Sequence, residues 1–220
     1  MNTNTAVLRA TGGGRDDVPG LPLSAARRRG RPQAIVGVGL WVFIGVATTL
    51  FALFISAYVM RLSNADAVAI AMPRQLWLST ALLVAGSVLL QRAGLAASAS
   101  QADHARWALL MGGACAVAFI GVQWWAWQAL LSRQVTPVGN PAGSFFFLLT
   151  AMHALHVSGG LVGLGVAGRA AWRPADASAP WRIALCARYW HFLLLLWLAL
   201  YACFTWITPE VARIICRTGG

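Results

Sequence analysis

Five stretches of mostly apolar residues dominate the sequence, and each is long enough to cross a bilayer core, which takes about 20 helical residues. They cover residues 35–58, 75–97, 105–131, 142–168 and 183–207. Of the 220 residues in the chain, 59% are hydrophobic and only 10% are charged, whereas soluble domains carry about 25% charged residues. The sequence therefore predicts an all-α polytopic membrane bundle with five transmembrane helices. It excludes a soluble globular enzyme, a disordered chain and a coiled coil.

The connections between these stretches are short and hold turn and breaker residues. Their prolines are Pro73, Pro137, Pro141, Pro174 and Pro180. Because short connections place consecutive helices antiparallel to each other, we expect one membrane bundle over residues 35–208. Residues 1–34 form a polar, arginine-rich tail without the pattern of a secretory signal, and residues 209–220 form a short tail after the bundle.

Arginine supplies all 17 basic residues, and its distribution predicts the orientation of the bundle. With the N-terminus inside, twelve of the 17 arginines lie on the cytoplasmic side and five on the other. Cytoplasmic connections of membrane proteins carry such an excess of basic residues, so we expect residues 1–34 in the cytoplasm and residues 209–220 in the periplasm. The formal net charge of +11 suggests nucleic-acid binding in a soluble protein. Here the arginines lie between apolar stretches, so they are interpreted as topology signals and lipid-headgroup contacts, with no nucleic-acid partner.

The six acidic residues all lie in the tails or connections, so none is expected well inside a membrane-spanning helix. Proton pumps and proton-coupled carriers usually depend on acidic residues inside the membrane, which argues against a transporter with its own proton path. The four cysteines form no CxxC pair, and their spacing fits neither a zinc nor an iron–sulfur site. They are interpreted as small apolar residues, and no catalytic residue or metal ligand is assigned to this chain.

The titratable residues well inside the apolar stretches are histidines. His153 and His156 are three residues apart and share a helix face, which Gly160 and Gly163 continue. Small residues let another helix approach closely, and polar side chains hydrogen-bond across such a contact, so this face predicts a packing surface. The alternative is haem ligation by one of these histidines and His191, which is expected at nearly the same depth. A single histidine pair favours packing over haem, because nothing else in the sequence indicates an open metal site.

Tryptophan is abundant, with 11 residues in the chain. Six of them lie near predicted helix ends, where aromatic residues anchor helices to the membrane interface. These are Trp41, Trp77, Trp107, Trp172, Trp181 and Trp206. Another group, Trp124, Trp125 and Trp127, lies in the third stretch. The neighbouring Gln123 and Gln128 indicate that this part of the helix faces the interior of the bundle rather than lipid.

Three of the stretches carry motifs that resemble one protein family. The fourth has an aromatic-rich HxxHV…G motif over Phe145–Gly160, and the fifth has a YWHF…W motif over Tyr189–Phe192 with Trp197. The first has an LWVF…LF…Y motif that begins at Leu40–Phe43 and ends at Tyr58. In this order the motifs resemble subunit III of the haem–copper oxidases over essentially the whole membrane part. The common form of that family has seven spans, and this chain resembles its shorter five-span form.

Two buried acidic positions of the family are apolar in this chain. Family members usually carry a glutamate in the middle of the LWVF helix, where this sequence has Ala47, preceded by Val46 in place of a serine. They also usually carry an aspartate two residues after the YWHF motif, where this sequence has Leu194. Roles proposed for that glutamate in proton uptake are therefore not carried over. We expect the His153 and His156 face to be satisfied by hydroxyl groups, water or other histidines.

The resemblance implies a non-catalytic subunit of a respiratory terminal oxidase, a complex that reduces oxygen to water. It implies oxidase subunits I and II and membrane phospholipids as partners, haem and copper in the catalytic subunits, and no cofactor in this chain. It also implies the bacterial inner membrane as the location. The residues expected to contact lipid or a neighbouring subunit are His153, His156, Gly160, Gly163, Arg188, Trp190 and His191.

Other functions compatible with the sequence concern the complex or the class of protein. Within the same family, the chain fits an accessory subunit of a nitric oxide reductase. Outside it, the chain fits an independent small transporter or a b-type cytochrome. The electron donor of an oxidase, cytochrome c or quinol, is not specified by these motifs.

Overall fold

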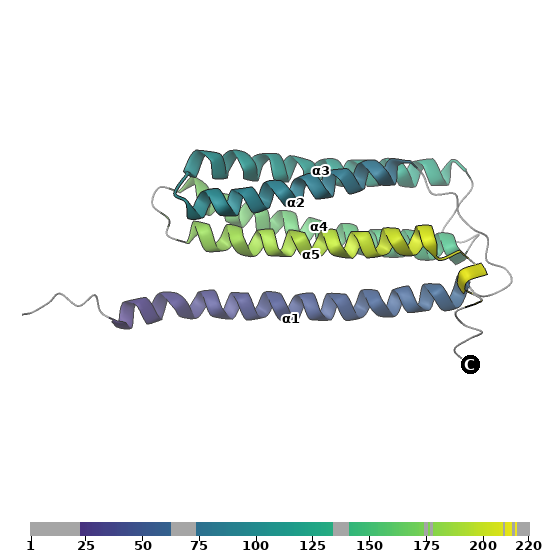
Figure 1. Cartoon of the computed structure of the whole chain (residues 1–220), viewed down its shortest axis with the longest axis horizontal. Helices are drawn as coiled ribbons and strands as arrows, with labels where there is room; N and C mark the ends of the chain where they lie inside the picture. Colours follow the sequence, from purple (N-terminus) through teal and green to yellow (C-terminus); the bar gives the residue numbers. More distant parts are fainter. Residues whose placement is uncertain are drawn as a thin grey trace, which may run out of the picture. The chain divides into compact units, whose positions relative to one another are not determined.

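The computed structural model describes residues 23–62, 74–133, 141–173, 176, 178–208, 210–212 and 214. Its five long helices are α1 (Leu23–Leu62), α2 (Gln75–Ser98), α3 (Ala102–Leu131), α4 (Pro141–Trp172) and α5 (Ala179–Trp206) (Figure 1). Each contains a segment long and apolar enough to cross a membrane, and the described residues contain no strand. The predicted all-α fold with five membrane-spanning helices is confirmed, and the chain is a multi-pass membrane protein.

The first helix is longer than the apolar stretch from which it was predicted. α1 begins at Leu23, twelve residues before the stretch 35–58, whereas its apolar segment begins at Ala34. Arginine and alanine favour helix, and they are frequent over residues 23–34, so the helix continues beyond its apolar part. Residues 1–22 and most of residues 209–220 lie outside the described residues, and the two expected tails stay predictions.

The chain consists of two compact units, Met1–Val36 and Gly37–Gly220. Of the first unit, the structure describes the beginning of α1. The second unit holds the remainder of α1 and helices α2 to α5, and all contacts below lie within it.

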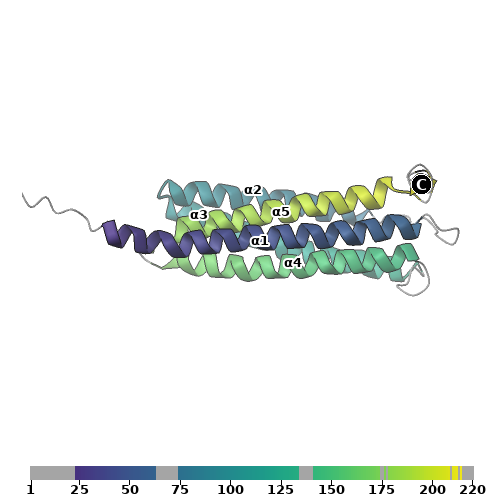
Figure 2. The same ribbon diagram turned by 90° about the horizontal axis from the view of Figure 1, so that it is seen from below.

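Helices α2 to α5 form a four-helix bundle in which each helix packs against two others. The contacting pairs are α2 with α3, α3 with α4, α4 with α5, and α5 with α2, and the four helices run side by side in both views (Figures 1 and 2). Within the second unit, no described Cα atom of α1 comes within 8 Å of another helix. Large aromatic side chains of α1 instead reach the bundle, for example Tyr58, whose ring lies 5.7 Å from that of Phe204.

Small residues allow the closest helix contacts. A Cβ atom added at Gly112 on α3 would lie 2.9 Å from Leu90 Cγ on α2, and one at Gly86 would lie 3.3 Å from Cys115 Cβ. Glycine at these positions brings two helix backbones together, as is common in membrane bundles. Larger side chains such as Phe119, Trp190 and Trp197 fill the rest of the core.

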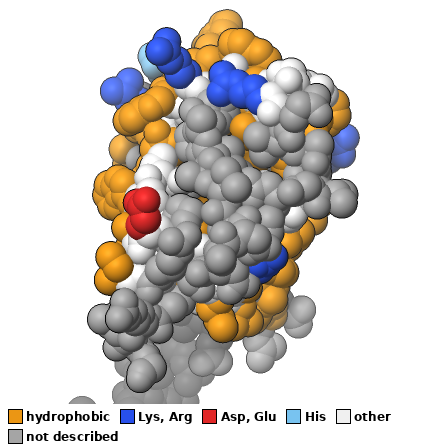
Figure 3. All heavy atoms as spheres, turned by 90° about the vertical axis from the view of Figure 1, so that its right-hand side faces the viewer, with side chains coloured by type: hydrophobic (Ala, Val, Ile, Leu, Met, Phe, Trp, Pro, Cys, Tyr) orange, Lys and Arg blue, Asp and Glu red, His pale blue; other side chains and the backbone are white. Residues whose placement is uncertain are grey.

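Apolar side chains also cover the outside of the helices. Val162 on α4 is 70% exposed and Leu155 is 65% exposed. Figure 3 looks onto the end at which α3 finishes and α2 begins, and hydrophobic side chains surround its rim. So large an apolar exterior is unfavourable in water and is the surface that a lipid bilayer accommodates.

Candidate functional site

The predicted contact residues come from α4 and α5, and His153 lies at the centre of the bundle. Its side chain is fully buried, with the ring of Phe119 on α3 at 5.7 Å and that of Trp197 on α5 at 5.2 Å. Trp197 Nε1 in turn donates to Thr80 Oγ1 on α2, 2.9 Å away. Neither ring nitrogen of His153 has a hydrogen-bond partner among the described residues. A charged imidazole is very costly in such surroundings, so His153 is interpreted as a neutral group on α4 that packs against α3 and α5.

Gln123 on α3 is a second buried polar side chain without a partner. It is 2% exposed, and neither of its amide atoms has a hydrogen-bond partner among the described residues. One turn further on, Trp127 Nε1 donates to Thr150 Oγ1 on α4 at 3.1 Å. Because Trp127 faces Thr150 and Phe119 faces His153, Gln123 lies at the level between them. We call the buried polar side chains Gln123 on α3 and Thr150 and His153 on α4 the polar layer of the core.

The prediction that this part of α3 faces inward is right for one glutamine and wrong for the other. Gln123 is buried, whereas Gln128 is exposed. Residues five positions apart on a helix point about 140° apart, so these two side chains cannot both face the same neighbour.

His156 has different neighbours from His153, although the two are only three residues apart. Its Nδ1–H donates to the Met152 carbonyl oxygen at 2.7 Å. Its ring lies 5.7 Å from that of Phe43 and 5.4 Å from that of Phe51, both on α1. His156 is thus a half-buried group at the contact between α4 and α1, and it is satisfied by the backbone of its own helix rather than by a hydroxyl group or another histidine.

Ala47, which occupies the position of the family's glutamate, lies on the same face of α1 as Phe43 and Phe51. Its side chain is 2% exposed, and both aromatic neighbours contact His156. At the level of His156, the position of the family's glutamate is therefore occupied by the methyl group of Ala47. Leu194, at the position of the family's aspartate, packs against the apolar core.

His191 on α5 makes two hydrogen bonds to α2. Its Nε2–H donates to Gln91 Oε1 at 3.0 Å, and its Nδ1 accepts a hydrogen bond from the Ser87 hydroxyl. Both nitrogens are engaged, and His191 faces α2 whereas His156 faces α1. The two histidines are not brought together as a haem-binding pair.

The two α2 partners of His191 were missed in the sequence. The signal that identifies them is their spacing, since Ser87 and Gln91 are four residues apart within an apolar stretch. Residues at this spacing share a helix face, and two polar residues on one face within a membrane helix indicate a polar helix contact.

The remaining predicted residues divide into a buried pair and two exposed positions. A Cβ atom at the buried Gly160 would lie 3.1 Å from Tyr189 Cε1 and 3.4 Å from Trp190 Cε2, and Trp190 itself is 1% exposed. Gly163 and Arg188 are exposed. The seven residues therefore occupy several environments, and their expected role as a lipid or subunit contact stays a prediction.

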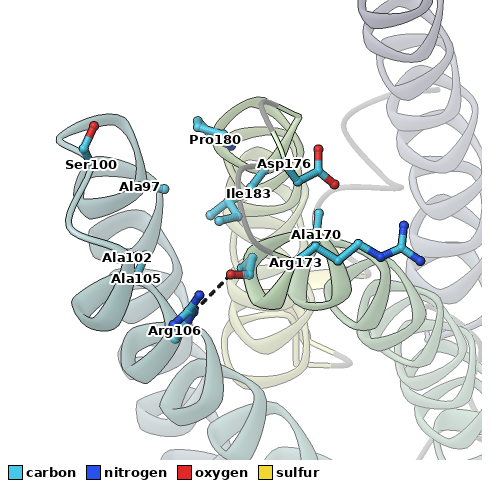
Figure 4. A pocket seen from close by; sticks show the side chains of 12 residues that line it. Ala97, Ser100, Ala102, Ala105, Arg106, Ala170, Arg173, Asp176, Pro180 and Ile183 are labelled. Carbon is cyan, nitrogen blue, oxygen red and sulfur yellow. Dashed lines mark hydrogen bonds between the residues drawn. The ribbon is translucent and has the colours of Figure 1, made fainter.

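At the end of the bundle where α4 finishes, a cavity of about 360 Å³ is lined mainly by alanine and other small residues, together with the charged residues Arg106, Arg173 and Asp176 (Figure 4). Arg106 Nε donates to the Ala171 carbonyl oxygen at 3.0 Å, one of the final carbonyls of α4. Beside the start of α5, the Asp176 carboxylate accepts hydrogen bonds from the Ser178 hydroxyl at 2.6 Å and the Ser178 N–H at 2.8 Å. These two bonds, with the positive charge of Arg182 nearby, hold the pKa of Asp176 below its ordinary value.

The described residues contain no group of three or more His, Cys, Asp and Glu side chains that could hold a metal ion. With five membrane-spanning helices and no charged residue in the described bundle core, the arrangement defines a polytopic helical membrane protein. The contacts described above are those of helix packing.

Several known proteins are similar in sequence to this chain. It is 33% identical over 87 residues to a probable cytochrome c oxidase subunit 3 of Mycobacterium bovis, which is 38% of this chain and 41% of the relative. It is 29% identical over 200 residues to the probable cytochrome c oxidase subunit 3 of Nocardia farcinica, which is 83% of this chain and 95% of the relative. A third relative is the cytochrome bo(3) ubiquinol oxidase subunit 3 of Pseudomonas aeruginosa, with 33% identity over 85 residues, 38% of this chain and 41% of that protein. No protein-family profile matches the chain.

These similarities confirm the resemblance to subunit III of the haem–copper oxidases. The matched region spans less than half the length of the mycobacterial relatives and nearly the full length of the Nocardia protein.

Proposed function

We propose that the chain is the non-catalytic subunit III of a bacterial respiratory oxidase. One observation carries the proposal: residues of its three separate motifs contact one another. Phe43 of the LWVF motif lies 5.7 Å from the His156 ring of the HxxHV motif and 6.0 Å from the Tyr189 ring of the YWHF motif. Motifs from α1, α4 and α5 thus form one aromatic cluster, which gives a structural reason for their occurrence in one sequence.

The catalytic chemistry belongs to partner subunits in this proposal. The partners are oxidase subunits I and II, the haem and copper that reduce oxygen to water lie in the catalytic part of the complex, and this chain carries neither. The relatives include subunits named for a cytochrome c oxidase and for a ubiquinol oxidase, so either donor fits. The complex resides in the inner membrane, with residues 1–34 in the cytoplasm and residues 209–220 in the periplasm.

The contribution of the chain is to stabilise the catalytic subunit and to hold structural phospholipid. The absence of any group of metal-ligand side chains among the described residues is compatible with such a role. The many large apolar side chains exposed on the flanks of the helices supply surface for both kinds of contact. Within the bundle, the hydrogen bonds of His191 and Trp197 to α2 keep the helices in the arrangement that presents this surface.

Affinity purification tests the proposal. The chain, tagged at its C-terminus and expressed in its native membrane, should be purified with a haem–copper core that consumes oxygen. Expressed alone, it should show no Soret band. Copurification with a nitric oxide reductase core would assign the chain to that complex instead. A Soret band in the singly expressed chain, or purification without any haem protein, would contradict the proposal.

Cysteine labelling tests the orientation independently. A cysteine at Asn2 in a variant without the native cysteines should react with an impermeant maleimide only after the membrane is opened. A cysteine near Gly220 should react in cells whose outer membrane alone has been permeabilised. The reverse pattern would show the opposite orientation, and labelling of both positions from one side would be incompatible with an odd number of spans.

A further inference from the structure

Three polar side chains lie together on the outside of the bundle, where α2 and α5 meet. His191 Nε2–H donates to Gln91 Oε1 on α2 at 3.0 Å, and Arg188 lies one turn before His191 on α5. Gln91 and Arg188 are exposed, and His191 is partly exposed. We call these three residues the α2–α5 polar patch. The surface around it differs, since it consists of exposed apolar side chains such as Val88 and Leu195.

Gln91 and Arg188 lie at about the same level of the bundle. The helices α2 and α5 are antiparallel, because Ser87 bonds to His191 whereas a residue nearer the start of α2 bonds to Trp197, nearer the end of α5. From the Ser87 contact, Gln91 lies one turn further along α2, and Arg188 lies one turn back along α5. The two side chains are therefore neighbours across the outer edge of this helix contact.

This level lies inside the hydrocarbon core of the membrane. α5 has 28 residues and α2 has 24, which gives lengths of about 42 Å and 36 Å at about 1.5 Å per residue. When each helix is centred on a core about 30 Å thick, it extends about 6 Å (α5) or about 3 Å (α2) beyond each side. Arg188 comes nine residues after the start of α5, and Gln91 comes seven residues before the end of α2. Both Cα atoms then lie about 7 Å below the boundary of the core.

The polar patch presents hydrogen-bond donors to the membrane. The amide nitrogen of Gln91 and the guanidinium group of Arg188 make no hydrogen bond or ion pair with another described residue. The amide nitrogen offers two N–H groups, the guanidinium group offers five, and arginine stays charged. Lipid tails supply no acceptor, so polar groups at this depth need a partner from protein. The group that complements the patch is one that accepts hydrogen bonds and carries a negative charge.

The depth of the patch favours an acceptor on a helix over a lipid headgroup. The long side chain of Arg188 can extend to the membrane surface, but the shorter side chain of Gln91 cannot reach it from the same depth. A second copy of this chain supplies no carboxylate here, because the only acidic residue of helices α1 to α5 is Asp103, in the first turn of α3. The acceptor therefore belongs to a different polypeptide that crosses the membrane beside α2 and α5.

We propose that the α2–α5 polar patch docks a transmembrane helix of a partner subunit, and that an aspartate or glutamate within this helix pairs with Arg188 and accepts a hydrogen bond from Gln91. His191 occupies the amide oxygen of Gln91, which leaves the amide nitrogen for the partner. This inference deepens the proposed function by naming the chemistry of one partner. It rests on the proposed function only for the identity of the complex to which that partner belongs.

Photo-crosslinking in the native membrane tests the docking site. Benzoylphenylalanine is introduced in place of Leu195, which is 65% exposed and lies two turns after Arg188 on the same helix face. It should link to a partner helix whose apolar stretch contains an aspartate or glutamate, as identified by mass spectrometry. Arg188→Gln should lower the yield of this link at least about tenfold, as expected when one member of a charge pair is removed. Arg188→Lys, which keeps the charge, should retain most of the yield.

Exchange of the charges tests the carboxylate itself. Replacing the partner's acidic residue with its amide should lower the yield as much as Arg188→Gln does. Gln91→Glu keeps an acceptor oxygen for His191 but removes the N–H groups and adds a negative charge, so it should also lower the yield. Arg188→Glu combined with arginine at the partner's acidic position should restore the link, because the pair is then present in the opposite sense.

Three controls separate docking from folding. Arg92→Gln removes the same charge from α2 but on a side about 100° from Gln91, and it should leave the yield unchanged. Benzoylphenylalanine at Val162 on α4, which is 70% exposed, should not link to the same helix. The singly expressed Arg188→Gln chain should unfold in mixed micelles like the wild type, since Arg188 bonds to no other described residue.

Equal yields for the wild type and Arg188→Gln would overturn the docking site. So would a linked helix without an acidic residue in its apolar stretch, or loss of bound phospholipid alone from Arg188→Gln, because the arginine would then serve a headgroup. A linked helix that carries the carboxylate but belongs to no oxidase would uphold the site and contradict the proposed function. Copurification with an oxidase, together with crosslinking that does not depend on Arg188, would do the reverse.

Discussion

The Tyr189 hydroxyl on α5 donates a hydrogen bond to the backbone carbonyl oxygen of His156 on α4, 3.0 Å away. A helical carbonyl normally accepts from the N–H four residues later, which for His156 belongs to Gly160. Tyr189 reaches this carbonyl because Gly160 has no side chain, as a Cβ atom there would lie 3.1 Å from Tyr189 Cε1. The glycine of the HxxHV…G motif and the tyrosine of the YWHF motif are thus two halves of one helix contact.

The first prediction follows from this contact. Gly160→Leu should destabilise the bundle by about 1 to 3 kcal/mol, the usual cost of overpacking a filled site, because Tyr189, Trp190 and Leu193 surround the new side chain. Gly163→Leu is the matched control, since a Cβ atom there meets nothing within 4 Å. The unfolding free energy in mixed micelles, measured with increasing dodecyl sulfate, should fall for the first variant only. Equal losses for both would show that the contact is not specific.

The second prediction concerns the hydrogen bonds between α2 and α5. Ser87→Ala and His191→Leu should each destabilise the protein, and the double variant should lose less than the sum of the two because both remove the same bond. The coupling free energy should be about 0.6 kcal/mol, the average for hydrogen bonds between membrane helices. Thr80→Val, which removes the bond from Trp197 to the same helix, should show no coupling to His191→Leu. A coupling free energy of zero between Ser87 and His191 would show that their hydrogen bond does not stabilise the α2–α5 interface.

The five helices were predictable because bilayer thickness imposes a minimum length on an apolar stretch. The surroundings of the histidines were not. His153 and His156 point about 60° apart on their helix, and this difference directs one to Phe119 on α3 and the other to Phe43 on α1. Spacing along one helix says which residues are neighbours on its surface, but not which helix lies opposite each of them. The polar pair Ser87 and His191 likewise depends on the packing of α2 against α5, which follows from the tertiary fold.

The third prediction addresses the polar layer of the core. Gln123→Leu should raise the unfolding free energy by about 1 to 3 kcal/mol, because a buried amide without partners costs this much and leucine has a similar volume. Gln128→Leu, at an exposed position of the same helix, should change stability little. The same micellar unfolding experiment measures both. Destabilisation by Gln123→Leu would indicate that a buried water links the amide to the polar layer.

The fourth prediction is a pH dependence at the start of α5. The pKa of Asp176 lies below its ordinary value because of the hydrogen bonds from Ser178, so the carboxylate supports this helix end above about pH 3.9, the ordinary value. That support is lost as the pH falls through the lowered pKa. Asp176→Ala should therefore speed hydrogen exchange of the Arg182 amide, which bonds to the Ser178 carbonyl oxygen at 3.2 Å, at neutral pH.

In strong acid the exchange rates of the wild type and of Asp176→Ala, corrected for intrinsic exchange, should converge. Asp103→Ala, which removes the carboxylate that pairs with Arg106, is the control and should leave exchange at Arg182 unchanged. A difference for Asp176→Ala that persists at all pH values would mean that the side chain acts through packing rather than through its charge.

The last prediction is that His156 serves packing and not proton transfer. Its Nδ1–H is held by the Met152 carbonyl oxygen, its ring faces Phe43 and Phe51, and the position of the family's glutamate beside it holds the methyl group of Ala47. A proton chain within a membrane needs ionisable or polar groups in succession, and these neighbours on α1 supply none. His156→Leu should weaken assembly or lipid retention by about 1 kcal/mol. The pH dependence of turnover in the assembled complex should stay unchanged.

The decisive measurement uses the purified oxidase complex with His156→Leu, after its subunit content has been verified. Oxygen consumption and proton release are recorded across pH beside the wild type and His156→Gln, a variant that keeps a polar side chain at this position. Both variants should match the wild type in protons released per electron, with His156→Leu alone losing subunit III on prolonged dilution. An assembled His156→Leu complex whose proton release collapses would establish the histidine as a relay and contradict the packing role.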